Sequence, residues 1–257
     1  MSKIIFAFDL DGTAIFSKNK IGDNTNNFKC VERINGVDFS FMSNDSFNSY
    51  VDFYSQYNDK VILLPITSRS ISQYKRIEWP NGLTPRLAIT TNGANLLENG
   101  VVSSDWHNIL LSNIGKTKKE RLSLVKQMSN MPGFVKFYDC DSAFDLVFFE
   151  TEKHAKNAKE KLIIKHNDIQ IFVSGRRIYV LSSKILKEKA LLRLKEIEKP
   201  DLIIAAGDSS IDVGYLKISD FQIITSNDLS NLFGAGTSVF SKNIFEIAKN
   251  KCCEFLS

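Results

Sequence analysis

Runs of consecutive apolar residues alternate along the chain with segments whose apolar residues recur at helical spacing. The runs cover residues 4–8, 61–66, 87–90 and 202–206, and polar residues follow each of them directly. A short continuous apolar run is typical of a strand buried on both faces, as in a parallel sheet between helices. Pro65 lies near the end of the second run, where a missing backbone donor is tolerated. We therefore predict an α/β fold with a Rossmann-like parallel-sheet core.

Apolar residues at three- and four-residue spacing predict a set of amphipathic helices. These comprise a helix capped by Ser43 or Asp45 with Phe47, Tyr50, Val51 and Tyr54 on one face, a helix over 116–130 with Leu122, Val125 and Met128, a helix from Thr151 to about 164 with Ala155, Ala158 and Leu162, a helix with Leu186, Ala190, Leu194 and Ile197, and a closing helix over 244–256. Residues 221–225 predict one more strand, and Asn99-Gly100 predicts a type I′ hairpin turn.

In two further segments the sequence shows no pattern of regular secondary structure or no nucleotide-binding motif. Residues 14–42 are polar and irregular, so we predict a loop there. Residues 234–237 (Gly-Ala-Gly-Thr) lack the spacing and the preceding strand–helix context of a dinucleotide-binding fingerprint.

The pattern changes near Trp106 and changes back at Lys184. Between them the order is helix, two strands (134–138 and 144–149), helix, and two strands (169–173 and 177–181). This duplicated order predicts a small α+β domain inserted into the core. We therefore divide the chain into a core of residues 1–107 and 183–257 and an inserted domain of residues 108–182.

Composition excludes several classes of protein. The chain has 257 residues, and no apolar run approaches the ~20 residues of a membrane span. The N-terminus shows no signal-peptide cleavage site, and the four scattered or adjacent cysteines suit reduced thiols, so we expect a cytoplasmic protein. A net charge of +4 is too small to indicate nucleic-acid binding.

Charge is unevenly distributed between the two predicted domains. Residues 108–182 contain 13 Lys and Arg against 8 Asp and Glu, whereas the rest contains 20 against 21. A basic domain over an acidic site would attract an anionic substrate. Most of these cations would equally suit a solvated helix face. Lys136, Arg176 and Arg177 lie on or beside predicted strands and are therefore the better candidates for substrate contacts.

The first apolar run ends in Asp9-Leu10-Asp11-Gly12-Thr13. Alternate residues of an extended segment point the same way, so Asp9 and Asp11 can face one small site. Two adjacent carboxylates suit Mg²⁺, which prefers oxygen ligands and keeps waters and phosphate in its shell. A calcium loop or a surface turn are alternatives, although an EF-hand is excluded because Ala14 occupies its glycine position.

All four runs end in polar residues that chemistry could use. Because carboxyl ends of parallel strands converge, these groups would share one crevice suited to phosphoryl transfer. Each residue alone also has a plain structural reading, such as a helix cap for Thr67, a turn for Asp208 and a solvated helix position for Lys187. The groups are Asp9 and Asp11, Thr67 and Arg69, Asn92, and Asp208 and Asp212.

Together these segments resemble the motifs of the haloacid dehalogenase (HAD) superfamily of phosphatases. Asn92-Gly93-Ala94 and the insert resemble the subgroup with a type IIB cap, which includes Cof-like and sucrose-phosphate phosphatases. The four superfamily motifs correspond to residues 9–13, Thr67-Ser68-Arg69, Lys187 in Lys-x-x-Ala-Leu-x-x-Leu, and Gly207-Asp208-x-x-x-Asp212. Two departures are Ile211, where the subgroup usually has Asn, and the long link over residues 14–60.

The resemblance implies a role for each matching residue. Asp9 would be the nucleophile and a Mg²⁺ ligand, and Asp11 the general acid/base with its backbone carbonyl on the metal. Thr67 and Lys187 would hold phosphate oxygens, with Lys184 and Lys189 as neighbours that fit the spacing less well. The remaining roles are Asp208 as a metal ligand, Asp212 as a group behind the metal or bound to it through water, and Arg69, Asn92, Arg176 and Arg177 as substrate-binding residues.

The function expected from this resemblance is Mg²⁺-dependent hydrolysis of a small phosphorylated metabolite, such as a sugar phosphate, through an aspartyl-phosphate. A phosphomutase of the same superfamily is one alternative. A non-catalytic binding protein on the same scaffold is another, and the intact acidic motif residues count against it. No nucleic acid or membrane partner is expected.

Overall fold

A computed structural model describes residues 3–165, 167–233 and 238–257. The Gly-Ala-Gly-Thr stretch at residues 234–237 therefore lies outside the described residues. The centre of the core is a parallel five-stranded sheet in the order β15-β14-β13-β1-β5, which confirms the predicted α/β core. Its strands are β1 (Ile4–Phe8), β5 (Val61–Pro65), β13 (Leu202–Gly207), β14 (Phe221–Ile224) and β15 (Ser238–Phe240).

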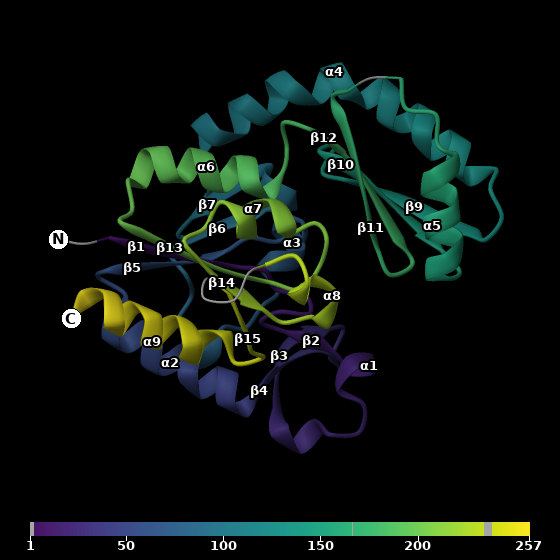
Figure 1. Cartoon of the computed structure of the whole chain (residues 1–257). Helices are drawn as coiled ribbons and strands as arrows, with labels where there is room; N and C mark the ends of the chain where they lie inside the picture. Colours follow the sequence, from purple (N-terminus) through teal and green to yellow (C-terminus); the bar gives the residue numbers. More distant parts are fainter. Residues whose placement is uncertain (1–2, 166, 234–237) are drawn as a thin grey trace.

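Strand β1 is buried on both faces, as its unbroken apolar run predicts. Ile4, Phe6 and Phe8 belong to the cluster that includes residues of α2 (Asn44–Tyr57) and α9 (Ile244–Leu256). Ile5 and Ala7 belong to the opposite cluster, with residues of α6 (Lys187–Glu198) and α7 (Val213–Lys217). Figure 1 shows the sheet between these two helical layers.

The third apolar run does not join the parallel sheet, which corrects our expectation for it. Strand β6 (Leu87–Thr90) pairs antiparallel with β7 (Asn95–Glu98), which pairs with β8 (Val101–Val102). A single parallel bridge between Ile66 and Ile89 brings β6 beside β5, so the two strand ends still meet. Pro65 is tolerated because β5 is the last strand of the parallel sheet. The hairpin at Asn99-Gly100 is confirmed, since both residues have positive φ.

The predicted loop over residues 14–42 is wrong. This stretch forms an antiparallel sheet in the order β2-β4-β3, which we call the flap (residues 16–43). Asn35 and Gly36, both at positive φ, connect β3 to β4, and this Asn-Gly pair is a strong hairpin signal. The flap elements are β2 (Phe16–Ser17), α1 (Lys18–Ile21), the 3₁₀ turn η1 (Thr25–Asn27), β3 (Phe28–Ile34) and β4 (Val37–Ser43).

The inserted α+β arrangement is confirmed, and we call its elements the cap. Its antiparallel sheet has the order β11-β12-β10-β9, and α4 and α5 lie on one side of it (Figure 1). The cap elements are α4 (Ser104–Ser129), β9 (Phe134–Cys140), β10 (Phe144–Phe149), α5 (Glu152–Lys161), β11 (Ile169–Ser174) and β12 (Arg177–Ser182). Helix α4 starts well before residue 116 and runs through the predicted boundary at 107/108.

Two helical faces differ from the prediction. Leu122 is 43% exposed, while its neighbour Leu124 is buried with Val125 and Met128. Ile197 at the end of α6 is 58% exposed. The caps are as predicted, because the Ser43 and Thr151 side chains accept hydrogen bonds from Ser46 N and His154 N.

Short elements complete the described chain. They are α3 (Ile71–Tyr74), the 3₁₀ turns η2 (Pro80–Gly82) and η3 (Thr91–Gly93), and α8 (Asn227–Ser230). Within the described ranges, no helix has the length and apolar content needed to cross a membrane.

Candidate active site

Three carboxylates meet at the carboxyl ends of two neighbouring strands. Asp9 follows β1, and Asp208 follows β13 directly. One carboxylate oxygen from each of Asp9, Asp208 and Asp212 lies within 4.8 Å of the others. Both oxygens of Asp212 are occupied: Oδ1 accepts from Lys187, and Oδ2 accepts from Asp208 N and from Ser209 N and Oγ. Asp212 therefore shapes the loop that presents Asp208.

Lys187 is the cation of this cluster. Its Nζ donates to Asp9 Oδ1 at 2.6 Å and to Asp212 Oδ1 at 2.7 Å, and its side chain is fully buried. Burial opposes its charge, but Asp212 and Asp9 outweigh that effect and raise the pKa of Lys187. The neighbouring lysines 184 and 189 are exposed. Lys187 is the first residue of α6. The residue before it, Leu186, lies close to Gly93, because a side chain at Gly93 would meet the Leu186 carbonyl oxygen at 2.7 Å.

The carboxylates repel one another in the absence of a further cation. Burial and the charges of Asp212 and Asp208 raise the pKa of Asp9, against the opposing charge of Lys187. Burial and Asp212 also raise the pKa of Asp208 to about 6. A crowded set of oxygen donors with this strain fits a hard divalent cation such as Mg²⁺.

Gly12 leaves room in the same place. It has φ +101°, and a Cβ there would collide with Asp208 Oδ2 and lie 2.7 Å from Lys20 Nζ. The sequence therefore needs glycine both for the backbone conformation and for the space beside Asp208.

Asp11 is not part of the three-carboxylate cluster and pairs with Arg69 instead. Its oxygens accept from Arg69 Nε at 2.7 Å and Nη2 at 2.8 Å, a bidentate pair. Burial opposes the charged form, but the hydrogen bonds and charge of Arg69 prevail and lower the pKa of Asp11. The side chain of Asp11 remains 46% exposed, whereas that of Arg69 is 8% exposed.

Thr67 and Asn92 lie side by side with no exposed surface. The Thr67 hydroxyl accepts from Arg69 N at 3.1 Å, and the Thr67 carbonyl accepts from Asn92 N at 2.9 Å. Asn92 Nδ2 donates to the Ile185 carbonyl at 3.4 Å, which ties the end of β6 to the segment that leads into α6. Asn92 Oδ1 is buried and has no hydrogen-bond partner within the described chain.

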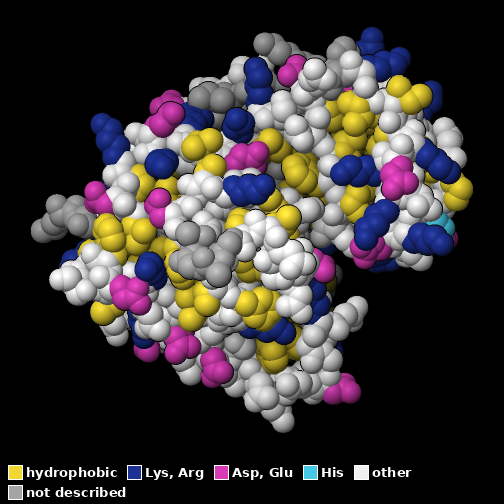
Figure 2. Space-filling model, in the orientation of Figure 1, with side chains coloured by type: hydrophobic (Ala, Val, Ile, Leu, Met, Phe, Trp, Pro, Cys, Tyr) yellow, Lys and Arg dark blue, Asp and Glu magenta, His cyan; other side chains and the backbone are white. Residues whose placement is uncertain are grey.

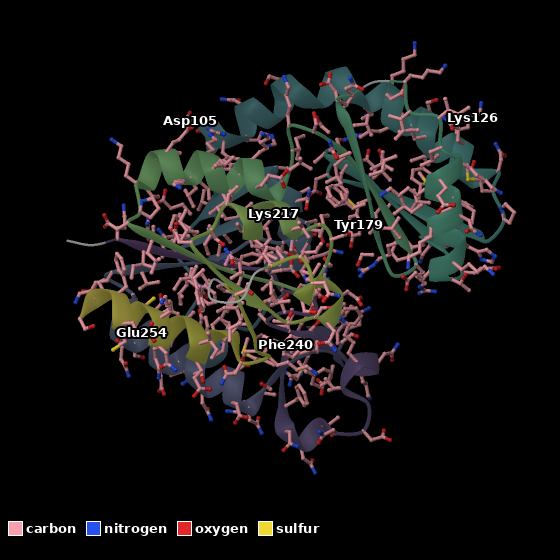
Figure 3. The ribbon with its side chains drawn as sticks, viewed as in Figure 1. Asp105, Lys126, Tyr179, Lys217, Phe240 and Glu254 are labelled. Carbon is pink, nitrogen blue, oxygen red and sulfur yellow. The ribbon has the colours of Figure 1, made fainter. Side chains whose placement is uncertain are left out.

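A cavity of about 690 Å³ lies between the core, the flap and the cap. Figure 2 shows a notch between the cap at the upper right and the flap below it. Tyr179 lies on the cap sheet on the side of the core (Figure 3). Arg177 lines the cavity, whereas Arg176 is exposed in the turn before β12 and is not among the lining residues. The lining includes Asp11 and Gly12 of the core, Ser17, Lys20, Ile34 and Phe39 of the flap, and Tyr138, Phe144, Leu146, Phe148, Arg177 and Tyr179 of the cap.

Sequence reasoning missed the flap residues of this site. Glu32 is fully buried and pairs with Arg69, and Lys20 Nζ lies 3.7 Å from Asp208 Oδ2. The Asn-Gly hairpin signal would have located the strands, but no local pattern marks the two side chains. Ile211, the departure from the fourth motif, packs in the apolar cluster that joins Phe144 and Tyr179 of the cap to Leu186 of the core.

The chain resembles proteins of known structure over nearly its whole length. The sucrose-phosphatase from Synechocystis sp. PCC6803, solved with sucrose and phosphate, has 14% identity and a TM-score of 0.65, over 99% of this chain and 98% of that one. The C-terminal domain of C. albicans trehalose-6-phosphate phosphatase has 13% identity and a TM-score of 0.63, over 98% and 92%. The HAD subclass IIB sugar phosphatase BT4131 has 13% identity and a TM-score of 0.60, over 100% of both chains.

Sequence comparison is informative at the level of the family. The family model described as sucrose-6F-phosphate phosphohydrolase matches residues 2–255. No curated protein matches the chain. The structural likenesses, at 13–14% identity, show the shared fold.

Proposed function

The chain belongs to the sucrose-6F-phosphate phosphohydrolase family of HAD-like phosphatases, and from this premise we propose that it hydrolyses a sugar phosphate with Mg²⁺ through a phosphoryl group carried on Asp9. The observation that carries the proposal is the Asp9 carboxylate at a strand end, held by buried Lys187 beside Asp208. The hydrogen bond from Lys187 fixes the direction of the Asp9 carboxylate. The positive charge of Lys187 also offsets negative charge in the site without a contribution from water.

The first chemical step forms one bond and breaks one. A carboxylate oxygen of Asp9 attacks phosphorus, and the bond from phosphorus to the sugar oxygen breaks. Asp11 is charged beside Arg69 when no substrate is bound, so it would take up the proton of the phosphate monoanion and pass it to that oxygen, and the sugar leaves as an alcohol. Thr67 and Lys187 hold the phosphate oxygens as negative charge shifts onto them.

The second step restores the enzyme. A water molecule gives a proton to Asp11 and attacks phosphorus, and the bond from phosphorus to Asp9 breaks. Inorganic phosphate leaves, and Asp9 is again a carboxylate. Asp11 serves as acid in one step and as base in the other, so its placement matters in both.

Asp9 and Asp208 would hold the Mg²⁺ ion, with Asp212 behind them and the Asp11 carbonyl as a further oxygen donor. The ion, when bound, neutralises the carboxylates and the phosphate so that the two can approach. Support comes from the three-carboxylate cluster, from the raised pKa of Asp208, and from the space that Gly12 leaves beside it.

The cap, which we assign to residues 108–182, selects the substrate. Aromatic side chains on the cap sheet and Phe39 of the flap offer flat apolar faces to a sugar ring, and Arg177 offers a hydrogen-bond fork. A volume of about 690 Å³ is within the size range of small-molecule sites.

Two variants test the chemistry. Asp9→Asn lacks the attacking carboxylate, so no phosphoenzyme should be detected by intact mass. Asp11→Asn keeps the nucleophile but loses the acid and base, so turnover should fall by ~10²–10⁴-fold and phosphoenzyme should accumulate with a nitrophenyl ester. The wild type should hydrolyse sugar phosphates and release inorganic phosphate. Chelation of Mg²⁺ should abolish this hydrolysis. Phosphoenzyme on Asp9→Asn, or full activity in chelator, would refute the proposal, and transfer of phosphate to a second sugar position would indicate a mutase.

A further inference from the structure

Glu32 of the flap is a carboxylate with no exposed surface. It accepts hydrogen bonds from Arg69 Nη1 at 2.8 Å, from Arg76 Nε at 2.9 Å and from Ser40 Oγ at 2.7 Å. The β3–β4 register shifts on both sides of Glu32, and such irregularities re-aim side chains. Burying a charged carboxylate is costly unless hydrogen bonds satisfy its oxygens. The three hydrogen bonds to Glu32 supply this compensation, so the fold holds the charge in a defined place.

Arg69 is held from two sides. Its guanidinium has five N–H groups, and five acceptors surround it. Two bonds reach Asp11, while the other three reach Glu32, Ser40 Oγ at 3.2 Å and the Gln73 carbonyl at 3.5 Å. Within the described chain, no Arg69 donor is therefore left over for a substrate.

The Asp11 carboxylate depends on this arrangement for its direction. It is 46% exposed and lines the cavity, so packing alone does not fix it. Among the described side chains, Arg69 is the one that hydrogen-bonds to it. Because the guanidinium is planar and rigid, whatever fixes its far side also fixes the plane of the carboxylate.

We propose that Glu32 is a positioning residue, which fixes Arg69 and through it Asp11, so that the flap is part of the catalytic machinery. This inference rests on the proposed function, in which Asp11 moves the proton. The competing explanation is that the network only fastens the flap to the core. The two explanations differ in what they predict for steps that need a proton from Asp11 and steps that do not.

Glu32→Gln is the test variant, because it keeps the shape and removes the charge that holds Arg69. Arg33→Gln is the matched control, since exposed Arg33 joins the flap to Glu78 of the core and pairs with Asp38, and no hydrogen bond within the described chain links it to Glu32, Arg69 or Asp11. We expect kcat for a sugar phosphate to fall about tenfold in Glu32→Gln, with KM changed by less than about twofold. Arg33→Gln should stay within about twofold of the wild type in both constants.

A second substrate separates positioning from fastening. In a single turnover with nitrophenyl phosphate, the leaving group needs little protonation, so phosphorylation of Glu32→Gln should stay within about twofold of the wild type. Phosphoenzyme should then accumulate, because its hydrolysis needs Asp11 as a base. Glu32→Asp, whose shorter carboxylate keeps the charge, should recover part of the lost kcat.

Several results would overturn the inference. They are an unchanged kcat in Glu32→Gln, an equal loss in Arg33→Gln, or an equal loss in the phosphorylation step on both substrates. If Glu32→Gln does not fold, Ser40→Ala decides: it removes a contact to both partners and should lower kcat about threefold, and no loss refutes the inference. A wild type that releases no phosphate from any ester would instead refute the proposed function.

Discussion

Asp208→Asn should stabilise the metal-free protein while abolishing its response to Mg²⁺. The pKa of Asp208 is raised from 3.8 to about 6, first by burial and then by the charge of Asp212. At ~1.36 kcal/mol for each tenfold change, the charged form costs the folded state about 3 kcal/mol at neutral pH. The side chain is 17% exposed, and its ion pair with Lys20 is long at 3.7 Å, so the asparagine loses little.

The sign of the pH dependence follows from the direction of the pKa change. The folded protein binds the Asp208 proton more tightly than the unfolded chain does. The associated stability is therefore fully present below about pH 4 and is lost as the pH rises through about 6. The advantage of Asp208→Asn should be about 2–3 kcal/mol at about pH 7.5 and smaller at about pH 5. For a chain of this size, that advantage corresponds to a Tm increase of roughly 4–12 °C.

The assay is thermal unfolding by circular dichroism, in chelator and in Mg²⁺, at both pH values. Mg²⁺ should raise the Tm of the wild type and leave the Tm of Asp208→Asn unchanged. The difference between the two Tm values should therefore shrink or change sign in Mg²⁺. Asp59→Asn, which changes an exposed carboxylate, is the control and should match the wild type under all conditions. A metal-free Asp208→Asn that melts below the wild type at about pH 7.5 would show that the cluster is not strained.

Three further changes test other parts of the site. Gly12→Ala forces a side chain into positive φ against Asp208, so Tm should fall by the equivalent of about 1–3 kcal/mol or more, and Mg²⁺ binding measured by calorimetry should weaken. Lys187→Met removes the partner of two buried carboxylates and should cost about 3–5 kcal/mol in urea unfolding at neutral pH; an unchanged midpoint would contradict the buried pairing. Arg177→Ala should raise KM for the preferred sugar phosphate by the equivalent of about 1–3 kcal/mol, and Arg176→Ala, outside the cavity, should not; equal effects would mean that the cap does not bind as described.

The sequence alone determined the core and the convergence of its motifs. The apolar runs of β1, β5 and β13 are buried between two helical layers, and polar residues at the ends of parallel strands meet whatever the details of packing. Asp9 and Asp208 are brought together for this reason, and Lys187 reaches Asp9 from the first residue of α6. The order of elements between 134 and 182 likewise sufficed for the cap, because each element is short and its hydrophobic period is clear.

Tertiary structure decided which faces of helix α4 are buried. The N-terminal part of α4 buries Trp106 against the core, while Leu124, Val125 and Met128 belong to the cap cluster. One helix with two partners has no single apolar face, so a stripe drawn through Leu122 missed the buried side.

The flap is where the sequence pattern was least informative. On β4, Val37 and Phe39 are exposed at 65% and 47%, whereas Ser40 is buried, and on β3 the charged Glu32 is buried completely. At these positions apolar side chains are exposed and polar side chains are buried, which is the reverse of the usual pattern. The buried polar groups are satisfied by Arg69 and Arg76 from distant parts of the chain. Hydrophobic periodicity records only the burial of apolar surface. A buried charge network is decided by partners that meet only in the folded protein.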